Sequence, residues 1–289
     1  MNKNFTAMIY TFNEERRLPY VYENLKNFCG IIVFDGGSTD GTFDYCKKHN
    51  IEFVSRPKED KNSEIMDLSR FSCALKYTPT EYVMHVYCSH FYPEALLNYF
   101  SKVADENELS AVYHDVIVYR YGVIVHKPFV RRIASACVFH KKSIITYEGS
   151  VIHDELAIKF DKTSMVRLKA TDDLSMHLFL DDDCSSLTTK TVKYTDLEAK
   201  QKFMGGVKIG FWGLLFKPLW RFVFAYFRLG SIIRGESGLV YSILNLVYDF
   251  QVSIKLWELR NGLDRQGVFR ENHLVRTKLN KDVNDSLRV

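Results

Sequence analysis

The clearest structural signal in this chain is the stretch Val33-Phe34-Asp35-Gly36-Gly37-Ser38-Thr39-Asp40-Gly41-Thr42. An apolar run ends at an aspartate, two glycines permit a tight turn, and a threonine or aspartate can then cap a helix. The pattern therefore predicts a buried strand over 31–35, a turn, and a helix over 39–49. The glycines are too short a run for a phosphate-binding P-loop, and no Lys-Ser or Lys-Thr pair follows them.

A second informative segment, Thr11-Phe12-Asn13-Glu14-Glu15, follows an apolar strand predicted over 5–11. Ligands of open parallel sheets bind beyond the carboxyl ends of the strands, where polar side chains and helix-start amides are available. The same residues also suit an ordinary helix start, with Asn13 as the cap and both glutamates in the first turn. This segment alone does not decide between a ligand site and a helix cap.

Outward from these segments, strands and helices alternate along the chain. Further strands are predicted over 51–55, 81–87, 110–119, 123–126, 164–169 and 175–178, and further helices over 14–28, 67–77 and 93–103. This alternation predicts an α/β fold, with a mainly parallel sheet and helices on its faces.

The character of the sequence changes near residue 190, so we expect a domain over 1–190 and a helical region over 191–289. Helices are predicted over 193–203 and 237–260, and the polar tail beyond Asn261 is predicted to be loose. Between them lies the aromatic tract 205–233. Its longest uncharged run is the eight residues 209–216, whereas a membrane span needs about 20 apolar residues.

The tract 205–233 instead fits a helix that lies in the plane of a membrane surface. On a helix, one face would carry Lys217, Arg221 and Arg228, and the opposite face Leu219, Trp220, Phe222, Phe224 and Phe227. Pro218 suits its first position and Gly230 its end. A basic stripe opposite aromatic residues predicts contact with an anionic membrane. The alternative is a core-packing helix with solvated arginines.

Composition limits the functional classes. Of 289 residues, 46% are hydrophobic and 26% charged, as in globular proteins. A net charge of +4 does not indicate nucleic acid, and we expect no such partner. No two of the six cysteines lie closer than 15 residues, which excludes CxxC redox pairs and zinc ribbons. We expect a reducing compartment and no cleaved signal peptide. The lack of GxGxxG argues against a dinucleotide oxidoreductase.

Taken together, Thr-x-Asn-Glu-Glu and Asp-x-Gly-Ser-x-Asp-Gly-Thr resemble the family 2 glycosyltransferases, over about residues 5–180. The resemblance implies the GT-A fold and a nucleotide-sugar donor, whose nucleoside these two segments hold. The donor-binding residues that it implies here are Thr11, Asn13, Glu14, Asp35, Gly36 and Ser38.

The later sequence resembles the lipopolysaccharide-core β-1,4-glucosyltransferase branch, through residues 174–177, 193–199 and the aromatic tract. Ile152-His153-Asp154-Glu155 resembles that branch's Val-His-Glu motif. The resemblance implies Asp154 as catalytic base, with Glu155 in reserve and His153 beside them; an exposed charged turn is the alternative. It also implies a saccharide or lipid-linked acceptor in bacterial surface polysaccharide or lipopolysaccharide synthesis. The resemblance further implies that the enzyme is either peripherally bound to the cytoplasmic face of the inner membrane or located in the cytoplasm.

The sequence departs from that family at its metal motif. The family follows its fourth strand with Asp-x-Asp, which holds Mg²⁺ or Mn²⁺ and the donor diphosphate. Here Tyr87 and Ser89 take those positions, and neither is a good ligand for a hard cation. His90 and His177 are weak metal candidates, with structural or substrate contacts as the alternative. Residues 181–183 are three aspartates that suit a solvated loop.

We therefore expect an inverting hexosyltransferase that works with or without a divalent metal. A departing diphosphate needs electrostatic stabilisation. Ser89, Arg70, Arg131 and Arg132 are the candidates for that contact, although each arginine also suits an exposed surface position. The alternative is a catalytically inactive GT-A relative that binds nucleotide or saccharide.

Overall fold

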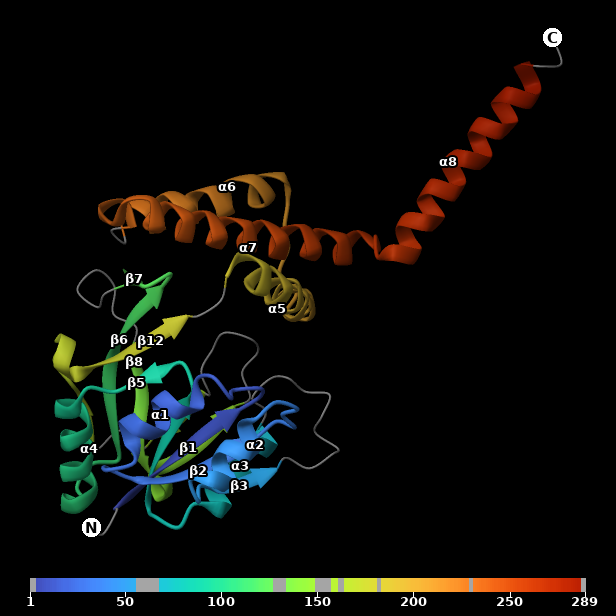
Figure 1. The fold of residues 1–289 in the computed structure, drawn as a ribbon. Helices are drawn as coiled ribbons and strands as arrows, with labels where there is room; N and C mark the ends of the chain where they lie inside the picture. The colour runs from blue at the N-terminus through green and yellow to red at the C-terminus, as the bar shows by residue number, and fades with distance from the viewer. Residues whose placement is uncertain are drawn as a thin grey trace. The chain divides into compact units, whose positions relative to one another are not determined.

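The computed structural model describes residues 4–55, 68–126, 134–148, 157–160, 164–180, 183–228 and 231–286. The chain forms two compact units. One comprises Met1–Asp183 with Tyr226–Tyr241, and the other comprises Cys184–Ala225 with Ser242–Val289. The first unit contains the strands, and the second contains helices (Figure 1). The chain therefore passes from the first unit to the second, returns, and leaves again.

The first unit is built on a ten-stranded mixed sheet with the path β3-β2-β1-β4-β8-β6-β12-β5, and with β7 and β11 also paired to β6. Its strands are β1 (Phe5–Thr11), β2 (Gly30–Asp35), β3 (Glu52–Ser55), β4 (Tyr82–Tyr87), β5 (His90–Phe91), β6 (Ala111–Arg120), β7 (Val123–His126), β8 (Ala134–His140), β11 (Met165–Arg167) and β12 (Ser175–Leu180). A separate antiparallel pair joins β9 (Ile144–Glu148) to β10 (Ala157–Phe160).

Most strand pairs of the large sheet are parallel. The strands β3, β2, β1 and β4 run the same way, as do β6, β11 and β12. Because β8 is antiparallel to both β4 and β6, the strands β6 and β12 point in the same direction as β1 and β4. Their carboxyl ends therefore meet at one edge. The prediction of a mainly parallel α/β sheet is confirmed.

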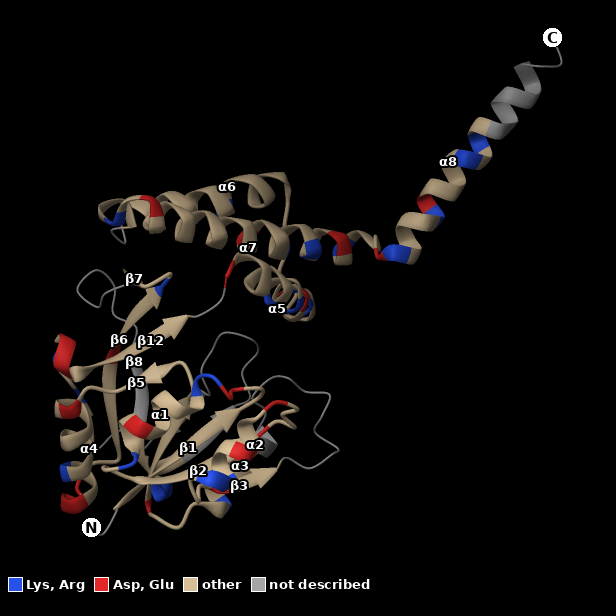
Figure 2. Cartoon of the chain, viewed as in Figure 1, with Lys and Arg blue, Asp and Glu red and all other residues tan. Residues whose placement is uncertain are grey.

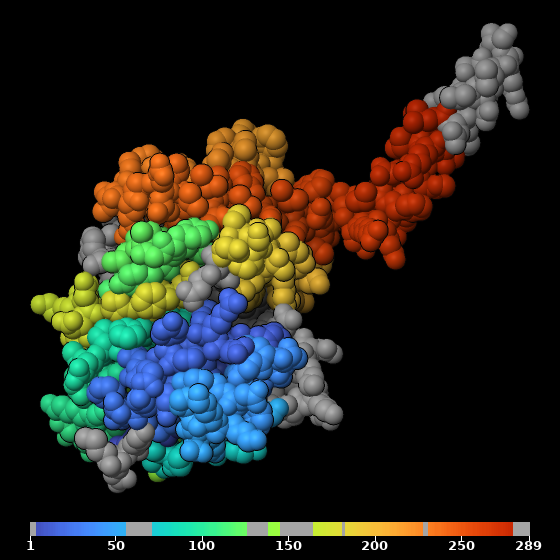
Figure 3. Space-filling view, in the orientation of Figure 1, coloured from blue at the N-terminus to red at the C-terminus, as the bar shows by residue number. Residues whose placement is uncertain are grey.

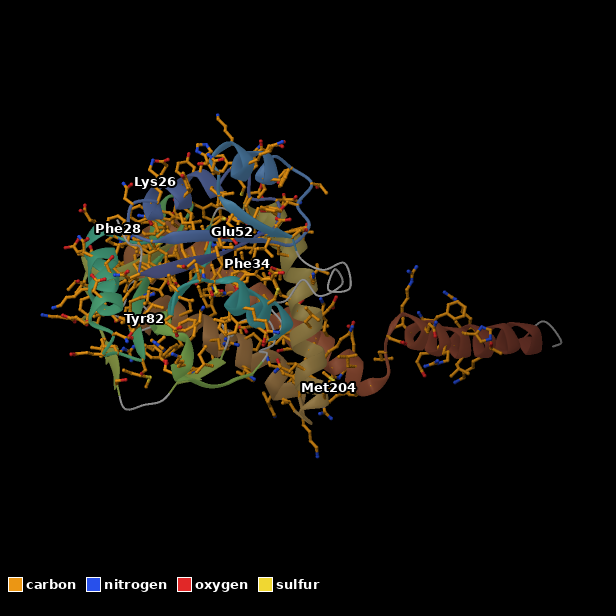
Figure 4. The ribbon with its side chains drawn as sticks, turned by 90° about the horizontal axis from the view of Figure 1, so that it is seen from below. Lys26, Phe28, Phe34, Glu52, Tyr82 and Met204 are labelled. Carbon is orange, nitrogen blue, oxygen red and sulfur yellow. The ribbon has the colours of Figure 1, made fainter. Side chains whose placement is uncertain are left out.

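Helices cover both faces of this sheet, which explains why its strands read as nearly continuous apolar runs. They are α1 (Leu18–Leu25), α2 (Thr42–Lys48), α3 (Leu68–Tyr77) and α4 (Glu94–Glu106). One face packs against Leu18, Val21 and Leu97. The other packs Met8 and Phe34 against α3, and Figure 4 labels Phe34 among the side chains of the sheet.

The second unit is helical. It contains α5 (Cys184–Met204), α6 (Phe211–Val223), most of α7 (Gly235–Asn261) and α8 (Arg265–Ser286). A π-helical segment, Phe224–Arg228, directly continues α6. Polar contacts join these helices: Tyr248 Oη donates to Glu198 Oε2 at 2.6 Å, and Arg221 pairs with Asp249 at 2.5 Å. Within the described residues, no helix combines the length and apolar character of a membrane span.

Two expectations for the C-terminal region were wrong. The tail is helical rather than loose. Asp264 caps the start of α8, because its Oδ1 accepts a hydrogen bond of 2.6 Å from the Gly267 amide. The helix also contains many residues of high helix propensity. Pro218 lies inside α6 rather than at its first position, because the aromatic run from Phe211 already forms the first turns. Gly230 lies outside the described residues.

Candidate functional site

The loops that follow β1 and β2 are joined to each other by hydrogen bonds. The Asn13 amide donates to Ser38 Oγ at 2.8 Å, and the Thr39 amide donates to Asn13 Oδ1 at 2.8 Å. Asn13 has a φ of 56°, in the left-handed region that asparagine tolerates. Its side chain thus links the two loops and does not cap α1, which begins five residues later at Leu18.

A second set of contacts extends this link as far as α2. The Glu14 amide donates to Thr42 Oγ1 at 2.9 Å, and the Glu15 amide donates to Asp40 Oδ2 at 3.1 Å. Asp40 Oδ1 also accepts from the Thr42 amide at 3.1 Å, at the start of α2. Partial burial opposes ionisation of Asp40, but hydrogen bonds from Thr42 and Glu15 prevail and lower its pKa.

Asp35 is the centre of the turn after β2. Its Oδ1 accepts from the hydroxyls of Thr11 and Ser38 at 2.9 and 2.5 Å, and its Oδ2 accepts from the amides of Gly37 and Ser38, each at 2.7 Å. The side chain is buried, with 3% of the residue exposed. Position 37 favours glycine, because its φ of +92° is a backbone conformation that residues with a side chain rarely adopt. The carboxylate therefore holds the turn in shape.

Glu14 forms a two-pronged ion pair within its own loop. Arg17 Nε and a terminal guanidinium nitrogen donate to the two carboxylate oxygens at 2.7 and 2.6 Å. Only 13% of the Glu14 side chain is exposed. Bidentate pairs of this kind fix the carboxylate in direction as well as position. Gly36 is also fixed, since its amide donates to the carbonyl of Thr11 at 2.8 Å.

These loops flank the topological switch point of the sheet. Since β1 lies between β2 and β4, the strand order changes direction there, and ligands of such sheets bind at this crevice. On one face of the sheet, the side chains at this edge are aromatic. The ring centroid of His85 lies 4.8 Å from that of Tyr10 and 4.8 Å from that of Tyr87.

Tyr10 and His85 each bury a polar atom that has no hydrogen-bond partner among the described residues. These atoms are the hydroxyl of Tyr10 and Nε2 of His85. Burial raises the pKa of Tyr10 and lowers that of His85 to about 4, so both groups are neutral at pH 7. Sequence reasoning missed both residues. The signal that could have revealed them is the presence of ring side chains with polar atoms in strands that are otherwise apolar.

The residues after β4 do not fit a hard divalent cation. His90 Nδ1 lies 2.9 Å from the hydroxyl of Tyr92, and burial, together with His85 and His114, lowers the pKa of His90 to about 3. His177 contacts the Tyr119 hydroxyl through Nδ1 and the carbonyl of Asp172 through Nε2. In the described parts of the chain, no three His, Cys, Asp or Glu side chains form a metal-binding group.

The remaining predicted site residues fall mostly beyond the described structure. His153, Asp154, Glu155, Arg131 and Arg132 lie outside it, and so do Asp181 and Asp182. Arg70 has a described backbone within α3, and its side chain is not described. Ser89 follows β4, where its carbonyl accepts from the Phe179 amide at 2.8 Å. The structure thus brings together the residues of the first two loops, and the roles of the others stay predictions.

No protein-family model matches the chain. Over 279 residues it is 23% identical to an uncharacterized glycosyltransferase of Rickettsia conorii, covering 91% of this chain and 93% of that protein.

Solved structures similar to this chain include two of TarS and one of a glucosyl-3-phosphoglycerate synthase. One is S. aureus TarS 1-349 in complex with UDP-GlcNAc, at 14% identity and a TM-score of 0.48, covering 90% of this chain and 92% of that one. The chain spans 55% of a longer TarS structure, at 13% identity and a TM-score of 0.46. The third is Mycobacterium tuberculosis glucosyl-3-phosphoglycerate synthase with Mn²⁺ and UDP-glucose, at 11% identity and a TM-score of 0.43, covering 72% of this chain and 81% of that one.

Proposed function

We propose that this protein is a glycosyltransferase that uses a nucleotide-sugar donor. The observation that carries the proposal is the hydrogen-bonded pair of loops after β1 and β2, which flanks the switch point of the sheet. Those loops contain the motifs that resemble family 2 glycosyltransferases. The similarity to the rickettsial glycosyltransferase adds support because it extends over nearly the whole of both chains.

The proposed fold class is GT-A, and the proposed reaction is an inverting hexosyl transfer of the lipopolysaccharide-core glucosyltransferase type. Asp154 would deprotonate an acceptor hydroxyl, which would attack the anomeric carbon and expel a nucleoside diphosphate. A single displacement with one base inverts that carbon. The motif at His153-Asp154-Glu155 supports this step. The acceptor would be a saccharide or lipid-linked saccharide of bacterial surface polysaccharide synthesis.

We further propose that cationic side chains stabilise the departing diphosphate in place of a bound metal. The chemistry of the residues after β4 supports this idea, since a phenol, a thiol, a hydroxyl and an imidazole are poor partners for Mg²⁺. Arg70, Arg131 and Arg132 are the proposed cations. Guanidinium groups suit the role because they bind phosphate oxygens in a bidentate manner.

The proposed place of action is the anionic cytoplasmic face of the bacterial inner membrane. The support is an apolar stripe on α6, where Trp212, Phe216 and Trp220 follow each other at intervals of four residues and are 68%, 52% and 68% exposed. The helix lies at the visible surface in Figure 3, and most of it is tan in Figure 2, since its charged residues are Lys217 and Arg221. An amphipathic helix of this kind lies in the membrane interface. Arg221 would contribute less to binding an anionic membrane than its sequence position suggests, because it pairs with Asp249.

The proposal is tested by calorimetric titration of the full chain with UDP, GDP, ADP and CMP. We expect one of them to bind, and we expect the matching nucleotide sugar to release its nucleotide when an acceptor is added. Binding without any release would favour the inactive relative, and the absence of binding by all four nucleotides would overturn the proposal. Glu52→Ala, an exposed change on the edge strand β3, is the matched control.

A further inference from the structure

Four ring side chains form a surface on three neighbouring strands, and we name it the Tyr119 surface. It consists of Phe91 on β5, His177 and Phe179 on β12, and Tyr119 on β6. Phe91 is opposite His177, and Phe179 is opposite Tyr119. The rings of Tyr119 and Phe179 are stacked, with centroids 4.6 Å apart and an interplanar angle of 19°. His177 stacks on the same tyrosine at 5.6 Å and 21°.

Polar contacts hold these rings in place. The hydroxyl of Tyr119 lies 3.0 Å from His177 Nδ1, and His177 Nε2 lies 3.1 Å from the carbonyl of Asp172. Both ring nitrogens of the histidine are therefore engaged, which fixes the plane of its ring. Phe91 and Phe179 are still 43% and 39% exposed. A partly open aromatic surface whose rings are already ordered loses little conformational entropy when it binds a ligand.

The Tyr119 surface lies on the same face of the sheet as the cluster at the switch point. Side chains alternate along β6, so Tyr119 faces the same way as Ala111 and Tyr113. Those two residues pack in the same cluster as Met8 and Tyr10 of β1. Tyr119 and Phe179 lie near the carboxyl ends of their strands, and the pairings through β8 place them about four residues, or roughly 13 Å, beyond the level of Tyr87 at the end of β4. Only β8 separates β4 from β6, a lateral spacing of about 10 Å.

The chemistry of this surface suits a pyranose ring. The C–H bonds on one side of a sugar carry partial positive charge and are attracted to the negative face of an aromatic ring. Hydroxyl groups at the rim of the sugar need polar partners, and the exposed pair Asp172 and Asp173 contacts His177 through the carbonyl of Asp172. A lipid chain has no groups that would pair with acidic residues. Ordered rings next to an exposed acidic segment therefore favour a saccharide over a lipid chain.

We propose that the Tyr119 surface binds the sugar ring of the acceptor. This inference rests on the proposed function, because a direct displacement requires the acceptor to lie beside the donor. The donor would occupy the switch point between β1 and β4, and the acceptor would approach along the same face from β6 and β12. Phe179 and Phe91 would provide the stacking contacts, and His177 would be a positioning residue for Tyr119.

The test is saturation-transfer NMR of the full chain with maltose, cellobiose and N-acetylglucosamine at millimolar concentration. We expect ring-proton signals from at least one sugar, and at least about tenfold weaker binding in Phe179→Ala. Tyr119→Phe keeps the ring and loses the contact with His177, so it should have an intermediate effect. Tyr20→Ala is the control, because Tyr20 is 77% exposed on α1, away from these strands.

The same variants are then titrated with the nucleoside diphosphate that binds the wild-type protein. Its affinity should be unchanged in Phe179→Ala, since the changed ring belongs to the acceptor side. If no nucleotide binds but a sugar still depends on Phe179, the proposed function fails and this surface stands as a saccharide site. The inference is overturned if no sugar gives a signal. It is also overturned if Phe179→Ala binds sugar like the wild type, or if it reduces only sedimentation with lipid vesicles.

Discussion

The hydroxyl of Thr11 donates a hydrogen bond of 2.9 Å to Oδ1 of Asp35, which joins the last residue of β1 to the last residue of β2. The same carboxylate accepts three more hydrogen bonds from the turn that follows it. A buried carboxylate with four donors is fully satisfied and strongly favours one backbone conformation. Asp35 thereby fixes the shape of the loop that we propose to receive the nucleoside.

Asp35→Ala should weaken nucleotide binding and destabilise the protein. The substitution leaves the partly buried amide of Ser38 and the buried hydroxyl of Thr11 without their acceptor. We expect a loss of about 1–3 kcal/mol in each property. Titration calorimetry measures the affinity, and urea unfolding measures the stability. Glu52→Ala controls for the loss of a carboxylate elsewhere. A folded Asp35→Ala protein with wild-type affinity would remove Asp35 from the nucleotide site.

Asp154→Asn should reduce turnover by about 10²–10⁴-fold, which is typical for the loss of a general base. Nucleotide affinity should change little, because the amide has the size of the carboxylate. Turnover is measured as nucleoside diphosphate released in the presence of acceptor. Glu155→Gln is the matched control, with an expected turnover near that of the wild type. Should Glu155→Gln be inactive while Asp154→Asn is active, the base is the neighbouring residue.

Turnover should persist in excess EDTA and fall sharply in Arg70→Ala. Without carboxylates after β4, a Mg²⁺ or Mn²⁺ ion would keep only weak ligands there, and cationic side chains would have to stabilise the diphosphate. Arg70→Lys keeps the charge and loses the bidentate geometry, so its turnover should lie between those of the wild type and Arg70→Ala. Arg131→Ala tests the second candidate. Activity that EDTA abolishes and Mn²⁺ restores would show that a metal site exists elsewhere.

The sequence predicted the order of the main elements well because their signals are local. Apolar runs that end in polar turns located β1 and β2, and Tyr121-Gly122 was correctly predicted as a turn, with φ values of 53° and 74°. The strands β9 and β10 were missed, and so were β8 and β5 of the large sheet. Strand β8 is antiparallel and β5 has only two residues, so neither continues the β-α-β pattern from which the others were inferred.

The site was predictable only where motifs carried it. The segments that contain Asn13 and Asp35 were correctly expected to lie together, since β1 and β2 are adjacent parallel strands. The Asn13 side chain bonds to the loop after β2, whereas the Asp35 side chain bonds mainly to its own turn. The first contact depends on the left-handed backbone of Asn13, which no sequence pattern predicts. Tyr10 and His85 were missed for a different reason. Their proximity arises from the register between β1 and β4, which is a long-range property.

Phe216→Ser combined with Trp220→Ser should release the protein from anionic vesicles. Both side chains lie on the exposed stripe of α6, and burial of an aromatic side chain in an interface contributes on the order of 1–3 kcal/mol. Sedimentation with vesicles that contain phosphatidylglycerol measures the effect. Phe269→Ser is the control, because Phe269 is equally exposed but lies on the polar helix α8. Deletion from residue 200 onward is a poorer test, since it also removes Tyr226–Tyr241 from the first unit.

Wild-type protein that never sediments with such vesicles would contradict membrane contact. The apolar stripe would then be a surface for another helix. Lys217→Glu separates the electrostatic part of the effect from the apolar part. It should weaken binding at low salt and have little effect at high salt, because screening shortens the reach of exposed charges.

The stability of the protein should decline as the pH falls from about 6.5 to about 4, and His114 should account for part of the decline. Burial lowers the pKa of His114 from its ordinary value of 6.5 to about 4 in the folded state, although Asp115 acts in the opposite direction. Between these values, the unfolded chain binds a proton at this site and the folded protein does not. Lowering the pH through this interval therefore favours unfolding. The contribution of His114 at neutral pH amounts to about 3 kcal/mol, and it is lost on acidification.

His114→Phe should flatten this dependence. The residue is 1% exposed and its ring lies 6.2 Å from that of Tyr92 and 6.3 Å from that of Phe100, so an aromatic replacement keeps the packing. Among the described residues its Nε2 has no hydrogen-bond partner, whereas its Nδ1 lies 3.0 Å from the carbonyl of Asp115, so the change removes one unsatisfied buried atom and one hydrogen bond. Urea midpoints between pH 4 and 7 measure the effect. The exposed His273→Gln should leave the curve unchanged, whereas a wild-type slope in His114→Phe would assign the dependence to His85 and His90.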